Sequence, residues 1–170
     1  MPRRRYHRHS SSRDKYSIEQ TTIRTPILND WAAVEATTET DASHQFNMPI
    51  IPPTAVEGMR KVKHLTFTIS NGASAGESVP LYYAIVYVPQ GYAPQPLRIP
   101  LVGQAASLYY ANQFVMSSGV LDFSGGPLRI RSPLSRNLNS GDSIYLVLAT
   151  LQSYAASSFF IEVQYAITLQ

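Results

Sequence analysis

Hydrophobic and polar residues alternate in several short runs along this chain, which is the period-two pattern of a β-strand with one buried face. The pattern predicts strands over residues 16–25, 43–48, 59–70, 79–88, 114–123, 127–133, 144–151 and 159–169. Glycine and proline lie mostly between these runs, as in Asn71-Gly72 and Ser124-Gly125-Gly126, and mark turns. We therefore expect about eight strands joined by loops.

Three segments carry more specific expectations. In 59–70, strict alternation puts Arg60 on one face, and Lys61 and Lys63 on the other, together with Leu65 and the apolar residues that follow it. The run 79–88 has no charge and is rich in β-branched and aromatic residues, so it predicts a central strand buried on both faces. Residues 103–113 have better helix propensity and predict a short helix or a single helical turn.

Strands do not alternate with helical patterns anywhere in the chain, which argues against a parallel α/β sheet. A length of 170 residues fits one domain. Eight antiparallel strands in one domain of this size predict an all-β fold of two packed sheets, a jelly roll or a related sandwich.

Positive charge is concentrated in the first fifteen residues, which hold six Lys/Arg and one acid for a net charge of +5. Residues 16–170 hold eight Lys/Arg and ten Asp/Glu, a net charge of −2. Because the like charges repel and a serine run follows them, we expect a disordered basic arm over 1–15 and a folded domain over 16–170. A short polyvalent arm on a near-neutral body suits a polyanion such as nucleic acid.

The rest of the composition favours self-assembly. Only 15% of residues are charged while tyrosine occurs 11 times, and a neutral, tyrosine-rich surface suits burial against copies of the same chain. There is no cysteine, which excludes disulfides, thiol nucleophiles and cysteine-ligated metals. No apolar run approaches the ~20 residues of a membrane span, and no secretory signal is recognisable, so we expect folding inside a cell.

Catalytic and metal-binding patterns are missing. The sequence contains no HExxH, GxSxG, GxGxxG or GxxxxGK[ST]. His7 and His9 lie among arginines that repel a cation, and His44 and His64 lack the further histidine and glutamate pattern of a metal-binding jelly roll. No spacing of loop Asp and Glu predicts a calcium site. We therefore expect no enzyme activity, no cofactor and no metal site within the domain, and a calcium site between subunits stays open.

Candidate nucleic-acid-binding residues form three groups. Arginine offers forked donors to phosphate and a flat face for stacking, so the first group is the arm: Arg3, Arg4, Arg5, Tyr6, Arg8, Arg13 and Lys15. The second is Lys61 and Lys63, and the third is Arg129 and Arg131, which share a strand face, with Arg136 nearby. Contacts of this kind are sequence-independent. The alternatives are a solubilising or nuclear-import tail, solvated strand-edge lysines, and arginine salt bridges at a subunit contact.

Three short motifs resemble the capsid proteins of small circular single-stranded DNA viruses. Residues 2–6 (PRRRY), followed by more Arg and His, resemble the start of a circovirus capsid protein. Residues 21–26 (TTIRTP) resemble the end of the first capsid strand, and 59–63 (MRKVK) resemble the family's Arg-Lys-Val-Lys strand. The later apolar runs follow the strand order and spacing of the shorter nanovirus coat proteins.

The resemblance implies a single eight-stranded jelly roll, with sixty copies forming a T=1 icosahedral shell around circular single-stranded DNA. It implies an arm that lies inside on the genome, a location in the virion and in the host nucleus during assembly, and nuclear-import machinery and a host receptor as further partners. The family's sheets, BIDG and CHEF, would contain B at 16–25, C at 43–49, D at 59–70, E at 80–88, F at 114–123, G at 127–133, H at 143–151 and I at 158–169.

The arm is shorter and less basic than a circovirus arm. Sixty arms supply roughly 300 charges, too few to neutralise a genome of a kilobase or more. Three explanations stay open: an inner shell face that includes Lys61, Lys63, Arg129 and Arg131 contributes, counterions contribute, or the arm serves import more than packaging. The alternative function is a small oligomeric β-sandwich binding module, receptor- or carbohydrate-binding, that forms no closed shell.

Overall fold

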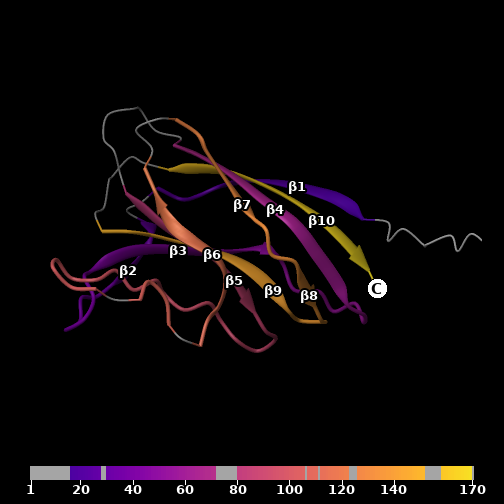
Figure 1. Ribbon diagram of the computed structural model, residues 1–170, viewed down its shortest axis with the longest axis horizontal. Coiled ribbons are helices and arrows are strands. Elements are labelled where there is room, and N and C mark those ends of the chain that lie inside the picture. Colours follow the sequence, from indigo (N-terminus) through magenta and orange to yellow (C-terminus); the bar gives the residue numbers. More distant parts are fainter. Residues whose placement is uncertain are drawn as a thin grey trace, which may run out of the picture.

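The computed structural model describes residues 16–27, 30–71, 80–105, 107–110, 112–122, 126–151 and 158–169. These residues form ten β-strands in two antiparallel sheets that pack face to face, and they contain no α-helix (Figure 1). The all-β, two-layer architecture expected from the alternating pattern is confirmed.

The first sheet, sheet A, has the strand order β1-β10-β4-β7. Its strands are β1 (Ser17–Arg24), β10 (Phe159–Leu169), β4 (Arg60–Asn71) and β7 (Leu128–Ser132), and a short fifth strand, β8 (Arg136–Leu138), pairs with the other end of β4. Among the described residues, β1 pairs only with β10 and β7 only with β4, so both strands are edges of the sheet. The first and last strands of the chain therefore lie side by side.

The second sheet, sheet B, has the strand order β2-β3-β9-β5-β6. Its strands are β2 (Ala32–Val34), β3 (Ser43–Ile51), β9 (Ser143–Thr150), β5 (Leu81–Val88) and β6 (Phe114–Leu121). All neighbours in this sheet run antiparallel. In Figure 1 it lies below sheet A, and the apolar faces of the two sheets meet between them.

Each of the eight predicted strands has a counterpart within two or three residues of its expected bounds. The count of eight is too low for the described residues, because β2 and β8 have three residues each and are too short to show an alternating pattern. The helix or helical turn expected at 103–113 is wrong for the residues described there, which form turns. Gly103 has a positive φ of 78°, which no right-handed helix contains, and Leu108 packs against the apolar segment over sheet B.

The main core lies between the sheets. Sheet A contributes side chains such as Leu65, Phe67 and Ile161, and sheet B contributes Ile85 and Leu146, all nearly inaccessible to solvent. Each side chain of this size that is fully buried stabilises the fold by about 1.5–3 kcal/mol. At one end of the core, the ring of Trp31 lies 5.5 Å from that of Phe46 and 6.1 Å from that of Phe159.

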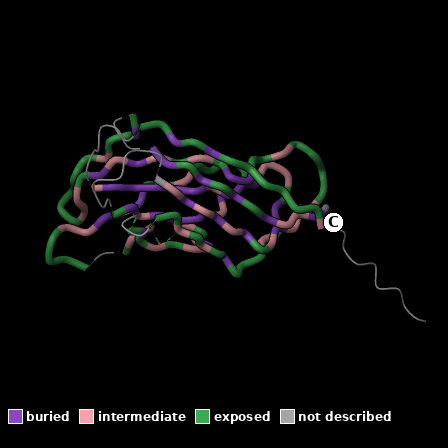
Figure 2. Tube along the Cα trace, turned by 90° about the horizontal axis from the view of Figure 1, so that it is seen from above, coloured by how far each residue is buried: buried purple, intermediate pink, exposed green. Residues whose placement is uncertain are grey.

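A second core covers the outer face of sheet B. The segment between β5 and β6 places Leu97 and Ile99 against Ala84, Val86 and Val147, so β5 is buried on both faces, as its uncharged sequence predicts. The side-chain amide of Gln45 holds this segment, because its Nε2 donates to the carbonyl of Leu97 and its Oε1 accepts from the Leu97 N–H, both at 2.7 Å. In Figure 2, stretches of buried residues run through the interior of the molecule and exposed residues lie mostly at its periphery.

The described residues include no second apolar layer over the outer face of sheet A. A β-bulge determines which residues this face carries. The register of β10 with β4 shows the bulge: Ala166 of β10 pairs with Lys63 of β4, and Gln164 pairs with Thr66. Two steps along β10 therefore match three steps along β4, so β4 has one extra residue at this point. His64 takes up the extra residue with a positive φ of 55°. The bulge reverses the alternation: Val62 and Leu65 both face the core, and Lys61 and Lys63 face outward. The prediction that both lysines share a face with Leu65 is therefore wrong.

Candidate nucleic-acid interface

Five cationic side chains lie on the outer face of sheet A. Residues that pair across antiparallel strands point to the same side of a sheet, so the register places each of them. In β7, Leu128 and Ile130 pack against the core, and the exposed Arg129 and Arg131 alternate with them. Arg131 pairs with Thr66, whose partner on the other side is Gln164.

The remaining three cations follow from β10. Its residues 160, 162, 164, 166 and 168 face outward, because the residues between them are core residues or pack against the core. Ala166 pairs with Lys63, Thr168 pairs with Lys61, and Phe160 pairs with Arg24 of β1. We call this set the basic face: Arg24, Lys61, Lys63, Arg129 and Arg131.

The basic face holds five of the eight Lys/Arg in residues 16–170 and, among the described residues, one carboxylate, Glu162. The side-chain amide of Gln20 on the neighbouring strand donates to Glu162. The five cations less this one acid give the face a net charge of +4. A charge of one sign spread over one side of a domain attracts polyanions through backbone phosphates rather than bases.

Aromatic rings lie among these cations. The Nζ of Lys63 is 3.9 Å from the ring centroid of Tyr16, and the guanidinium carbon of Arg24 is 5.3 Å from that of Phe160. Phe160 is 40% exposed. Cations together with accessible rings are the combination that single-stranded nucleic acid uses, because phosphates meet the charges and bases stack on the rings.

The basic arm joins the sheet beside this face. The candidate arm residues Arg3, Arg4, Arg5, Tyr6, Arg8, Arg13 and Lys15 lie outside the described residues. Residue 15 is bonded to Tyr16, which precedes edge strand β1 and lies against Lys63. The fifteen arm residues are thus attached at the border of the basic face, next to Tyr16.

Three cations of the folded domain lie elsewhere, and Arg60 is the most buried of them. It is 9% exposed, and its guanidinium donates to the carbonyl of Pro52 at 3.1 Å and to that of Asp142 at 3.0 Å. Burial lowers its pKa, while nearby Tyr165 and Asp142 act to raise it. Arg60 holds the two sheets together at one end of the sandwich, which agrees with its expected position opposite Lys61.

Asp142 is the centre of that polar cluster. Its carboxylate accepts hydrogen bonds from the hydroxyl of Tyr87 at 2.8 Å, the N–H of Asn139 at 2.8 Å and the N–H of Gln90 at 3.1 Å. Burial acts to raise the pKa of Asp142, but these hydrogen bonds outweigh it and hold the pKa below its ordinary value. Both carboxylate oxygens of Asp142 accept hydrogen bonds from the surrounding residues, so the cluster has a structural role.

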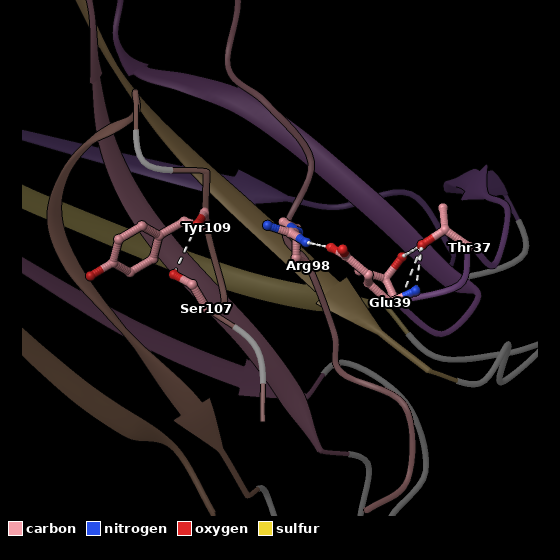
Figure 3. Close-up of polar contacts among 6 residues, drawn as sticks. Thr37, Glu39, Arg98, Ser107 and Tyr109 are labelled. Carbon is pink, nitrogen blue, oxygen red and sulfur yellow. Dashed lines mark hydrogen bonds and ion pairs between the residues drawn. The ribbon is translucent and has the colours of Figure 1, made fainter. Parts of the chain in front are cut away.

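Arg136 and Arg98 are also committed to contacts within the fold. Arg136 pairs with Val62 on the core side of β4, and its guanidinium carbon lies 4.1 Å from the ring centroid of Tyr87. It is therefore separated from Arg129 and Arg131, which the sequence grouped with it. Arg98 lies over sheet B and points to Glu39, with which it forms an ion pair (Figure 3).

Sequence reasoning missed two members of this surface. Arg24 ends the first predicted strand, and its alternation with Ile23 was the signal that it faces outward. His64 is exposed and lies with Arg131 on the same face, whereas from the sequence it is weighed only as a metal ligand. The signal for His64 was the spacing of Val62 and Leu65. These two apolar residues are three positions apart, so a regular strand would place them on opposite faces and only a bulge places them on one face.

Among the described residues, no three His, Cys, Asp or Glu side chains lie close enough to hold a metal ion. No helix in the described part of the chain is long and apolar enough to cross a membrane. The chain was compared with models of known protein families, and no family model matches it. A search of curated proteins also gave no match.

Proposed function

We propose that this chain is the structural subunit of a small icosahedral shell that encloses circular single-stranded DNA. The observation that carries the proposal is the basic face of sheet A, at the border of which the basic arm is attached. In the shell this face is the inner wall, and nucleic acid binds to it and to the arm without sequence preference.

The strand order supports a jelly-roll topology within this proposal. In a jelly roll, strands B to I alternate between two sheets ordered B-I-D-G and C-H-E-F. With B as β1, D as β4, G as β7 and I as β10, sheet A has the first order. With C as β3, E as β5, F as β6 and H as β9, sheet B has the second, and β2 is an additional edge strand.

The basic face supplies positive charge that the short arm lacks for neutralising a genome. The arm contributes a net +5 per chain and the face a net +4, so the positive charge available to the genome nearly doubles. Among the three explanations left open by the sequence, a contribution from the inner wall is therefore the one we adopt.

Exposed apolar side chains support self-assembly. Tyr92 and Phe114 are 77% and 52% exposed and line a hollow of about 450 Å³ between the β5–β6 segment and edge strand β6. Val88, Pro89 and Pro94 also line it. An apolar hollow with exposed aromatic rings at a sheet edge is typical of a protein–protein contact, since aromatic residues are enriched at the centres of interfaces.

The test of assembly is a mass measurement on the purified full-length chain by light scattering, with negative-stain images of the same sample. Sixty copies of an 18.9 kDa chain have a mass of about 1.1 MDa. A closed particle near this mass supports the proposal. A monomer or trimer under all conditions of salt and pH contradicts it and favours the alternative, a receptor- or carbohydrate-binding sandwich.

The test of packaging is the nucleic-acid content of particles formed by the full chain and by a chain lacking residues 1–15. We expect the deletion to lower the content but not abolish it, because the basic face remains. Unchanged content and unchanged salt sensitivity of DNA binding in the deleted chain would exclude a packaging role for the arm.

A further inference from the structure

The basic face is hollowed at the bulge of β4. A hollow of about 650 Å³ opens there, lined by Ile18, His64, Thr66, Arg129, Arg131 and Gln164, among others. This volume lies within the range of pockets that hold small molecules, about 300–1,000 Å³. All its lining residues belong to sheet A or to the chain that leaves β7.

The hollow has a clear cause in the pairing of β4. One side of β4 pairs with β7 at residues 65–69 and with β8 at residues 60–62. Lys63 and His64 lie between these two ladders, where the chain leaves β7 through Pro133 and rejoins β4 only at Arg136. The extra residue of the bulge lies at the same place, so the sheet is interrupted and the outer face is indented.

Two kinds of chemistry meet in this hollow. Arg129 and Arg131 project from the same face of β7, two residues apart, and supply two guanidinium groups for a phosphate. Ile18, which is 70% exposed, and Ala166 opposite it supply an apolar wall. A ligand that matches both needs an anionic group joined to a flat, largely apolar one.

Polar groups that can read such a ligand also line the hollow. Thr66 and Gln164, which pair across β4 and β10, offer a hydroxyl and an amide. Ser132 also borders the hollow, but it pairs with the fully buried Leu65, so its side chain faces the core and not the ligand.

We propose that this hollow is a nucleotide subsite, in which one base of the single strand lies against Ile18 and Ala166 while a neighbouring phosphate binds Arg129 and Arg131. This inference rests on the proposed function, because the ligand is a unit of the packaged DNA. It goes further by making one nucleotide per subunit a specific contact, whereas the arm and the rest of the face act through charge alone.

The experiment fills the hollow without changing its charge. Ala166→Phe places a large ring on the wall, and Thr22→Phe is the matched control, since Thr22 faces outward on the same sheet but does not line the hollow. Binding of a labelled oligothymidylate about ten nucleotides long to the full-length chain is measured by fluorescence anisotropy across a range of salt concentrations. Circular dichroism and thermal unfolding check that both variants are folded.

We expect Ala166→Phe to weaken binding about tenfold at every salt concentration, because the substitution removes one base contact without removing a positive charge. The slope of log affinity against log salt stays as in the unmodified chain. Arg131→Gln, by contrast, makes the slope shallower by about 0.7. Thr22→Phe leaves both affinity and slope unchanged.

Equal binding by Ala166→Phe, Thr22→Phe and the unmodified chain would overturn the nucleotide subsite but leave the proposed function standing. If the unmodified chain itself showed no salt-dependent binding of DNA, the proposed function would fail. A second measurement needs no variant: photo-crosslinking of the unmodified chain to an oligonucleotide that contains 4-thiothymidine. The subsite predicts crosslinks in the peptides around Ile18 and Ala166, and crosslinks confined to other peptides would contradict it.

Discussion

Replacing four cations of the basic face tests whether this face binds nucleic acid. The variant carries Lys61→Gln, Lys63→Gln, Arg129→Gln and Arg131→Gln, which keep the side-chain stems and remove the charge. All four residues face away from the core, and within the described part of the chain only Lys63 makes a charge-dependent contact, with the ring of Tyr16. Lys63 and Tyr16 are both half-buried, and losing their contact costs about 0.5–2 kcal/mol, so the variant should fold.

The magnitude follows from counting charges. Six cations of the arm and five of the face give eleven candidate phosphate contacts. On single strands, each contact contributes about 0.7 to the slope of log affinity against log salt, so the unmodified chain should have a slope near −8 and the variant near −5. Between 50 and 200 mM salt, the unmodified chain should then lose roughly fiftyfold more affinity than the variant.

The assay is fluorescence anisotropy of a labelled oligothymidylate long enough to span both arm and face, titrated at five salt concentrations. Arg98→Gln is the control for charge removed elsewhere, since Arg98 lies over sheet B in an ion pair with Glu39. It should leave the slope unchanged. Glu162→Gln removes the one described acid of the face and should make the slope steeper. If the fourfold variant keeps the slope of the unmodified chain, the basic face does not bind DNA.

Three further predictions concern the elements that hold this surface in place. His64→Val forces a β-branched residue to a φ of 55° and should lower the free energy of unfolding, measured by urea denaturation, by about 1–2 kcal/mol. His64→Gly should leave this free energy nearly unchanged, because glycine adopts a positive φ readily. Gln45→Leu leaves the buried N–H and carbonyl of Leu97 unpaired, which should cost about 2–4 kcal/mol and speed amide exchange in the segment over sheet B. The lowered pKa of Asp142 means that its charged form stabilises the fold above the unfolded-state pKa, about 4, and that this contribution is lost as pH falls through the lower folded-state pKa. Asp142→Asn should therefore lower stability at pH 7 by about 2 kcal/mol and flatten the decline in acid, measured by thermal unfolding between pH 2 and 7.

Most of the fold was predictable because the long strands of a sandwich show their two faces directly in the sequence. The run from Phe159 to Leu169 alternates without a break, and the uncharged run from Leu81 to Val88 predicts burial on both sides. What covers the second side was not predictable, because Leu97 and Ile99 lie in a proline-rich segment without alternation. Their position depends on a hydrogen-bond pair with Gln45, which is 52 residues away in sequence.

The candidate site was predictable in part. The pairs Lys61/Lys63 and Arg129/Arg131 each share a face by local alternation, and the structure brings both pairs to one face through the register of β4 with β7 and β10. That register depends on long-range pairing, which no local pattern contains. Local alternation therefore could not separate Arg136 from Arg129 and Arg131, or place Arg24 beside cations more than a hundred residues away.

The pairing of β1 with β10 also has a consequence for the order of folding during synthesis. Ser17 pairs with Ile167, 150 residues further along the chain. On the ribosome, β1 therefore lacks its described partner strand until β10 has emerged, and this part of sheet A cannot form earlier. Contacts so distant in sequence are typical of β-sandwiches, which fold in milliseconds to seconds. Arg24 joins the other cations only through this pairing, so the complete basic face forms only after β10 has been made.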